Sequence, residues 1–63
     1  MSYYDYEISR KLAAEWSFYG LLMAAMRAAD SINAELLRGA FPKVWDELQD
    51  RYNAPGGRLT GEG

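Results

Sequence analysis

The sequence predicts an all-α protein, a small bundle of three to four short helices that assembles as a homo-oligomer. Apolar residues recur at helical spacing, and the stretches they form are separated by residues that cap helices. The chain has 63 residues, of which 49 % are hydrophobic, and no cysteine. A domain of this size buries only about 60 % of the surface of its unfolded chain. Without disulfides or a metal, its stability requires efficient packing or self-association.

The first helix begins after Ser2, a good N-cap residue, and extends to about Glu15. Tyr4, Ile8 and Leu12 recur every four residues and form one apolar stripe along it.

A second helix, capped by Ser17, spans Phe18 to about Asp30 and is apolar on nearly every side. Such a helix is buried on more than one face. Small residues spaced four apart allow another backbone to approach closely. We therefore expect this helix to supply the subunit interface, through Gly20, Met23, Ala24, Met26 and Ala28.

The third helix is short, begins at the cap Asn33 and ends at Ala40, with Leu36 and Leu37 facing inward. Phe41-Pro42 then breaks the chain, because the residue before a proline is disfavoured in helical conformation.

The last helix starts at Pro42, which suits the first turn of a helix. Its apolar stripe consists of Val44, Trp45, Leu48 and Tyr52. The segment from Asn53 to Gly57 ends it. The chain therefore divides into a helical domain over residues 1–54 and a Gly-rich tail over residues 55–63.

The composition excludes several function classes. No cysteine and no histidine means no disulfide framework, no thiolate or imidazole zinc site, and no Cys or His nucleophile or base. A net charge of −2 argues against a non-specific nucleic-acid binder, which needs a basic face. No base–nucleophile pair has a recognisable spacing, so we expect no enzymatic activity and no cofactor.

Asp46 and Asp50 have the spacing at which two carboxylates can share a divalent ion. Nothing supplies the remaining ligands, so a solvated acidic face is favoured and no metal site is expected. Gly56-Gly57 before Arg58 lacks the strand–loop–helix frame of a phosphate loop, and a helix terminator is favoured there.

Arg27 is the most informative candidate, because it lies within the most apolar helix. Its guanidinium either pairs with Asp30 or a carboxylate of another helix, or binds an anion, with copies clustered near an oligomer axis. Surplus tyrosines can stack on a base or fill a partner's pocket. The candidate ligand-binding residues are Tyr3, Tyr6, Tyr19, Arg27, Arg51 and Arg58.

The location expected from the sequence is the cytoplasm. The first residues lack the positive charges that precede a signal hydrophobic region. The apolar run from Tyr19 to Met26 is much shorter than the ~20 residues of a membrane helix.

One pattern covers most of the chain: FYGLLMAAMRAAD over residues 18–30, then Asn33, Phe41-Pro42, Trp45, Glu47-Leu48, Arg51-Tyr52 and Ala54-Pro55-Gly56-Gly57. It resembles very short accessory proteins of tailed bacteriophages. The resemblance implies a protein that acts in the bacterial host cytoplasm or is a minor part of the virion. It carries over no catalytic or binding residue.

By analogy with small phage proteins that act by stoichiometric binding, we expect an oligomer that binds and sequesters an anionic small ligand. The most concrete ligand is a nucleotide second messenger of host antiviral defence. One alternative is a protein–protein inhibitor or adaptor of a host enzyme that docks through the acidic residues Asp46, Glu47 and Asp50. A minor virion assembly protein is the other.

Overall fold

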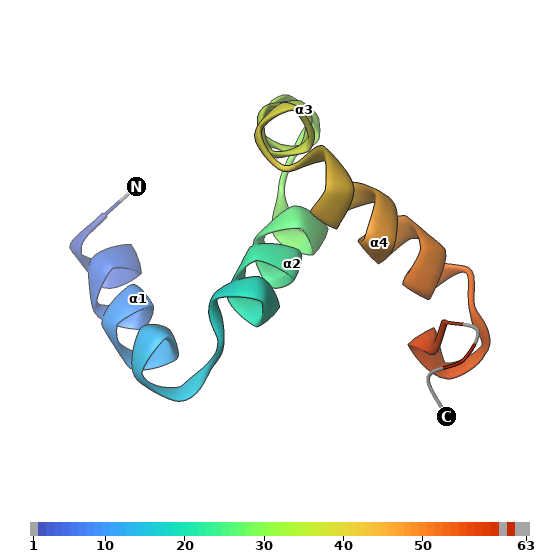
Figure 1. The fold of residues 1–63 in the computed structure, drawn as a ribbon. Coiled ribbons are helices and arrows are strands. Elements are labelled where there is room, and N and C mark those ends of the chain that lie inside the picture. The colour runs from blue at the N-terminus through green and yellow to red at the C-terminus, as the bar shows by residue number, and fades with distance from the viewer. Residues whose placement is uncertain (1, 60, 62–63) are drawn as a thin grey trace.

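The structure is a computed structural model that describes residues 2–59 and 61. This part of the chain forms four short helices, one 3-10 turn and no strand, which confirms the predicted all-α class (Figure 1). The elements are α1 (Tyr3–Glu15), α2 (Phe18–Ala28), α3 (Ser31–Ala40), α4 (Pro42–Tyr52) and the 3-10 turn η1 (Pro55–Gly57).

Serine side chains cap the first two helices, as the sequence predicts. The backbone N–H of Asp5 donates to Ser2 Oγ at 3.2 Å, and that of Gly20 donates to Ser17 Oγ at 3.1 Å. Each cap pairs an N–H of the first turn that has no partner within its own helix.

The break between α2 and α3 differs from the prediction. Helix α2 ends at Ala28, and Asp30 rather than Asn33 caps α3. Ala29 and Asp30 are extended, with ψ of 142° and 175°. This conformation lets Asp30 Oδ1 accept the backbone N–H of Asn33 at 2.8 Å. Asn33 is therefore the third residue of the helix and the recipient of the cap.

The end of α4 follows the prediction more closely. Pro42 occupies the first turn and the helix stops at Tyr52. Gly56 and Gly57 have φ of 63° and 72°, a left-handed conformation that favours glycine and reverses the chain. The predicted tail over residues 55–63 thus begins with an ordered turn. Its positions 60, 62 and 63 lie outside the described residues.

The core of the described chain is very small. Three side chains are buried, Leu22 and Met26 of α2 and Leu48 of α4. Half-buried residues packed around them are Met23, Leu37, Phe41, Val44 and Trp45. Helix α4 therefore covers one side of α2.

Several residues expected on apolar stripes are exposed, among them Tyr4 and Leu12 of α1. Leu36 of α3 is 66 % exposed and Tyr52 of α4 is 73 % exposed. Leu36 lies at an open groove between α2 and α3, and Tyr52 lies at one between α2 and α4, so the neighbouring helix covers only part of each side chain.

The molecule is open rather than compact. Its radius of gyration is 13.4 Å, against about 11 Å for a compact domain of this length. Helix α1 contacts α2 alone and diverges from the other helices (Figure 1). Among the described residues, no helix has the length and apolar character needed to cross a membrane.

Candidate functional site

Arg27 lies in the last turn of α2 and opens onto a groove between α2 and α4. The groove has a volume of about 380 Å³, within the range of small-molecule sites. Its lining consists of Met26, Arg27, Trp45, Leu48, Gln49 and Tyr52. We call it the Arg27 groove.

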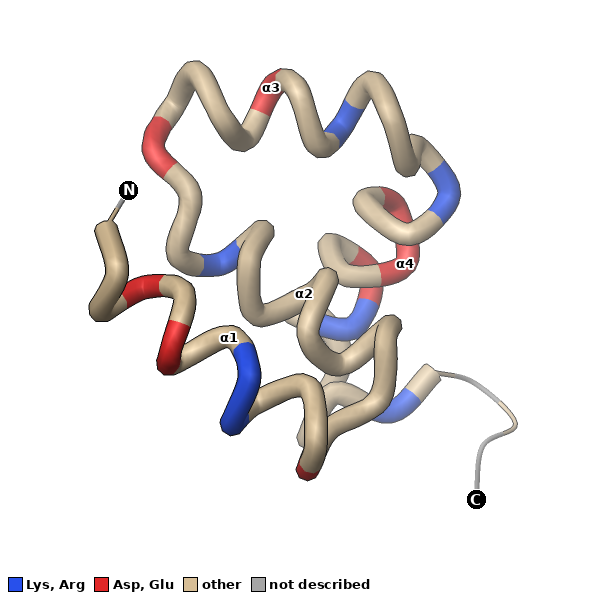
Figure 2. Tube along the Cα trace, turned by 90° about the vertical axis from the view of Figure 1, so that its left-hand side faces the viewer, with Lys and Arg blue, Asp and Glu red and all other residues tan. Residues whose placement is uncertain are grey.

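The guanidinium of Arg27 is exposed and available. In the described part of the chain it forms no ion pair and no hydrogen bond. The expected pair with Asp30 is not formed, because that carboxylate caps α3 instead. Charged segments are sparse along α2 and frequent along the other helices (Figure 2), and Arg27 is the one charged residue of α2.

Helix α4 supplies the remaining polar and aromatic groups of the groove. Trp45 is half-buried against the core, whereas Tyr52 and Gln49 are exposed. A guanidinium binds phosphate or carboxylate in a bidentate manner, and aromatic rings stack on nucleobases. The arrangement is suited to a ligand that carries both an anion and a flat ring.

The sequence interpretation assigned Trp45 and Tyr52 to an apolar stripe and did not consider Gln49. The spacing of Trp45, Gln49 and Tyr52 is the signal that could have identified this part of the site. Positions 45, 49 and 52 follow the i, i+4, i+7 pattern of one helix face, beside the buried Leu48. A face that carries a polar amide between two aromatic residues differs from an ordinary core stripe.

The other predicted arginines do not line the Arg27 groove. Arg51 Nε donates to Glu47 Oε2 at 3.2 Å, and its Nη1 donates to the Gly57 carbonyl at 3.0 Å. Arg58 follows η1, where its backbone N–H donates to the Pro55 carbonyl at 3.3 Å.

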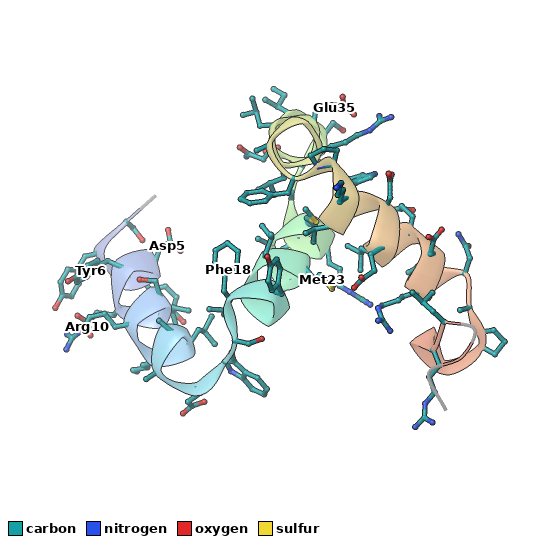
Figure 3. The ribbon with its side chains drawn as sticks, viewed as in Figure 1. Asp5, Tyr6, Arg10, Phe18, Met23 and Glu35 are labelled. Atoms are coloured by element: carbon teal, nitrogen blue, oxygen red, sulfur yellow. The ribbon has the colours of Figure 1, made fainter. Side chains whose placement is uncertain are left out.

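The predicted tyrosines also lie elsewhere in the single chain. Tyr19 lines a separate groove with Lys43 and Glu47, and its ring packs edge-on against Phe18 at 5.2 Å. The rings of Tyr3 and Tyr6 lie 6.3 Å apart on α1. Figure 3 shows Tyr6 and Arg10 projecting from α1 away from the other helices.

The predicted interface residues divide into two groups. Met26 is 5 % exposed and belongs to the core of the chain itself, and Met23 is half-buried beside it, on the side of α2 that faces α4 (Figure 3). Both methionines contribute to the core of the single chain, and their contribution to a subunit interface stays a prediction. Gly20, Ala24 and Ala28 are exposed.

Within the described residues, no cluster of three or more Asp and Glu side chains is placed to hold a metal ion. Asp46 and Asp50 lie exposed on α4. Comparison of the chain with known protein families, curated proteins and solved structures found no match. The Arg27 groove and the exposed apolar faces therefore carry the functional inference.

Proposed function

We propose that this protein is a non-enzymatic homo-oligomer that binds and sequesters an anionic ligand with an aromatic ring. The most concrete candidate is a nucleotide second messenger of host antiviral defence, captured in the bacterial cytoplasm. The observation that carries the proposal is the Arg27 groove, where a guanidinium without a partner in the described chain lies beside Trp45, Gln49 and Tyr52.

The chemistry of the groove favours a nucleotide over a simple anion. Arg27 provides a bidentate donor for phosphate, and Tyr52 and Trp45 provide flat apolar surfaces for a base. The Gln49 amide both donates and accepts, as recognition of a base edge requires. Stoichiometric capture needs no catalytic group, which agrees with a chain that has neither cysteine nor histidine.

Self-association is supported by the exposure of large apolar side chains. Ten are exposed among the described residues, including Trp16, Phe18 and Ile32. A contiguous exposed apolar patch marks an interaction surface, and Leu12 and Trp16 line one apolar groove together with Leu21. The exposed Gly20, Ala24 and Ala28 remain candidates for that interface, whereas Met23 and Met26 stabilise the single chain.

Calorimetric titration with cyclic dinucleotides and cyclic ADP-ribose isomers tests the proposal. We expect Arg27→Ala to weaken binding at least tenfold, because it removes the phosphate donor. Arg38→Ala is the matched control, since Arg38 pairs with Glu35 on α3 and lines no part of the groove. Absence of heat with every ligand, in a sample that is helical by circular dichroism, would count against the proposal.

The aromatic contribution is tested by a second pair of variants. Tyr52→Ala is expected to weaken binding, whereas Tyr6→Ala, on α1, is expected to leave it unchanged if a single chain forms the site. An equal loss in both variants would mean that Tyr6 reaches the groove from another copy.

A second candidate function is inhibition of a host enzyme by protein–protein contact. Asp46 and Asp50 are exposed on α4 and form no ion pair in the described chain, so they present free negative charge. Affinity capture from host lysate with the wild type and with Asp46→Asn/Asp50→Asn tests it. A role in virion assembly predicts instead that the protein is detected by mass spectrometry in purified particles.

A further inference from the structure

The side of α2 that α4 leaves open carries two apolar grooves. The first, between α1 and α2, is lined by Leu12, Trp16, Gly20, Leu21 and Ala24. The second, between α2 and α3, is lined mainly by small residues and leucines, namely Ala25, Ala28, Ala29, Leu36, Leu37 and Ala40, together with Asn33. Because Ala24 and Ala28 are four residues apart on one helix, the two grooves adjoin along α2. We call this surface the open face of α2.

The open face of α2 contains both protruding and recessed apolar groups. Trp16 and Leu36 are 61 % and 66 % exposed and protrude at its two ends. Between them the small side chains of Ala24 and Ala28 leave a shallow strip. Because a twofold interface joins a patch to the same patch of another copy, the patch must contain both protruding and recessed groups. The open face of α2 contains both.

The absence of charged residues from the two grooves also favours a second copy of this chain as the occupant. A quarter of the residues of the chain are charged, yet no Asp, Glu, Lys or Arg lines either groove. A nucleic acid or a strongly charged protein would find no complementary group here. A partner at this face must present an uncharged apolar surface of matching shape, and a second copy of this chain presents one.

The accessible surface of the whole chain is large enough to supply the interface of a stable dimer. The accessible surface is 5380 Å², whereas a folded monomer of 7.1 kDa is expected to expose about 4100 Å². The excess is about 1300 Å² per chain. If both partners buried it, the interface would total about 2600 Å², within the range of obligate homodimers.

We infer that the open face of α2 is the contact between two copies of this chain, related by a twofold axis beside Ala24. In this arrangement α2 packs antiparallel on the partner's α2, so Gly20 lies opposite the partner's Ala28. The end of α1, with Leu12 and Trp16, then covers the α2–α3 groove of the other copy. This inference rests on the self-association in the proposed function and names the surface that produces it.

Cysteine crosslinking tests the interface, because the native chain contains no cysteine. Ala24→Cys places one thiol beside the proposed axis, and a cysteine replaces alanine there with little change in volume. A short bifunctional maleimide is expected to convert most of this variant to covalent dimer. Ala14→Cys is the matched control, since Ala14 is an exposed alanine of α1 that lines neither groove and is expected to stay uncrosslinked.

Light scattering on the wild type separates this inference from the broader proposal. A strictly monomeric wild type at 100 μM, about a hundredfold above a dissociation constant of 1 μM, would overturn both self-association and the interface. An oligomer in which Ala24→Cys stays uncrosslinked would overturn the interface alone. Crosslinking of Ala24→Cys in an oligomeric wild type, with no crosslinking of Ala14→Cys, supports it whether or not a nucleotide binds.

Discussion

Arg51 donates a hydrogen bond from Nη1 to the carbonyl of Gly57, at a distance of 3.0 Å. The same guanidinium donates from Nε to Glu47 Oε2 at 3.2 Å. Arg51 therefore ties the turn η1 back to the last turns of α4. Gly57 presents its carbonyl in this position with a φ of 72°, which few other residues adopt.

The first prediction concerns this connection. Arg51→Ala is expected to lower the free energy of unfolding by about 1–2 kcal/mol, because it removes a half-buried hydrogen bond and an i, i+4 ion pair. Urea denaturation at fixed protein concentration measures the change. Arg38→Ala, which removes an exposed ion pair with Glu35, is expected to cost less than about 0.5 kcal/mol. Equal losses in the two variants would contradict a specific role for the contact with Gly57.

Two glycines are expected to respond to alanine with opposite signs. Gly39 lies inside α3 and an added Cβ would meet no atom within 4 Å, so Gly39→Ala should stabilise the protein by about 0.5–1 kcal/mol. Gly57 has positive φ, so Gly57→Ala should destabilise it by about 1 kcal/mol. Thermal unfolding followed by circular dichroism measures both. The same sign in both variants would be incompatible with the backbone conformations described above.

The local signals of the sequence were sufficient for the elements but not for their packing. Ser2, Ser17 and Pro42 begin helices as predicted, because each acts on its immediate neighbours. The start of α3 was misplaced because Asp30 and Asn33 both have cap chemistry, and the sequence does not show which one is extended. Helical spacing places Leu36 on an apolar face but does not say whether a neighbouring helix covers that face.

Only part of the candidate site was predicted, because local signals in the sequence do not determine how the helices pack. Arg27 stands out in an apolar helix, and sequence analysis found it for that reason alone. Its neighbours Trp45, Gln49 and Tyr52 come from α4, about twenty positions later in the chain. Bringing them together depends on the packing of Leu48 against Met26, a contact between distant segments that no local pattern encodes.

A pair of variants at the start of α3 tests the cap. Asp30→Ala removes the acceptor of the Asn33 N–H and is expected to cost about 1 kcal/mol of stability. Asn33→Ala keeps that N–H and introduces a better helix former, so its effect should remain within about 0.5 kcal/mol. Urea denaturation compares the two. A larger loss for Asn33→Ala would show that Asn33 is the cap after all.

The final prediction separates the core of one chain from the surface between two. Leu48 is 6 % exposed and Leu36 is 66 % exposed, although both are leucines on amphipathic helices. Leu48→Ala is expected to destabilise the chain by about 2–5 kcal/mol, because it leaves a cavity in a core with three buried side chains. Its effect on unfolding should be present at every protein concentration.

Leu36→Ala should act on association instead, because Leu36 lines the groove that the partner's α1 covers in the proposed dimer. Complete burial of a leucine contributes about 1.5–3 kcal/mol, and each dimer loses two copies. We therefore expect the dissociation constant of the dimer to rise at least tenfold, measured by light scattering over a dilution series. Helical content at high concentration should remain that of the wild type. If Leu36→Ala left the dissociation constant unchanged, α3 would lie outside the interface and the contact would have to be confined to α1 and α2.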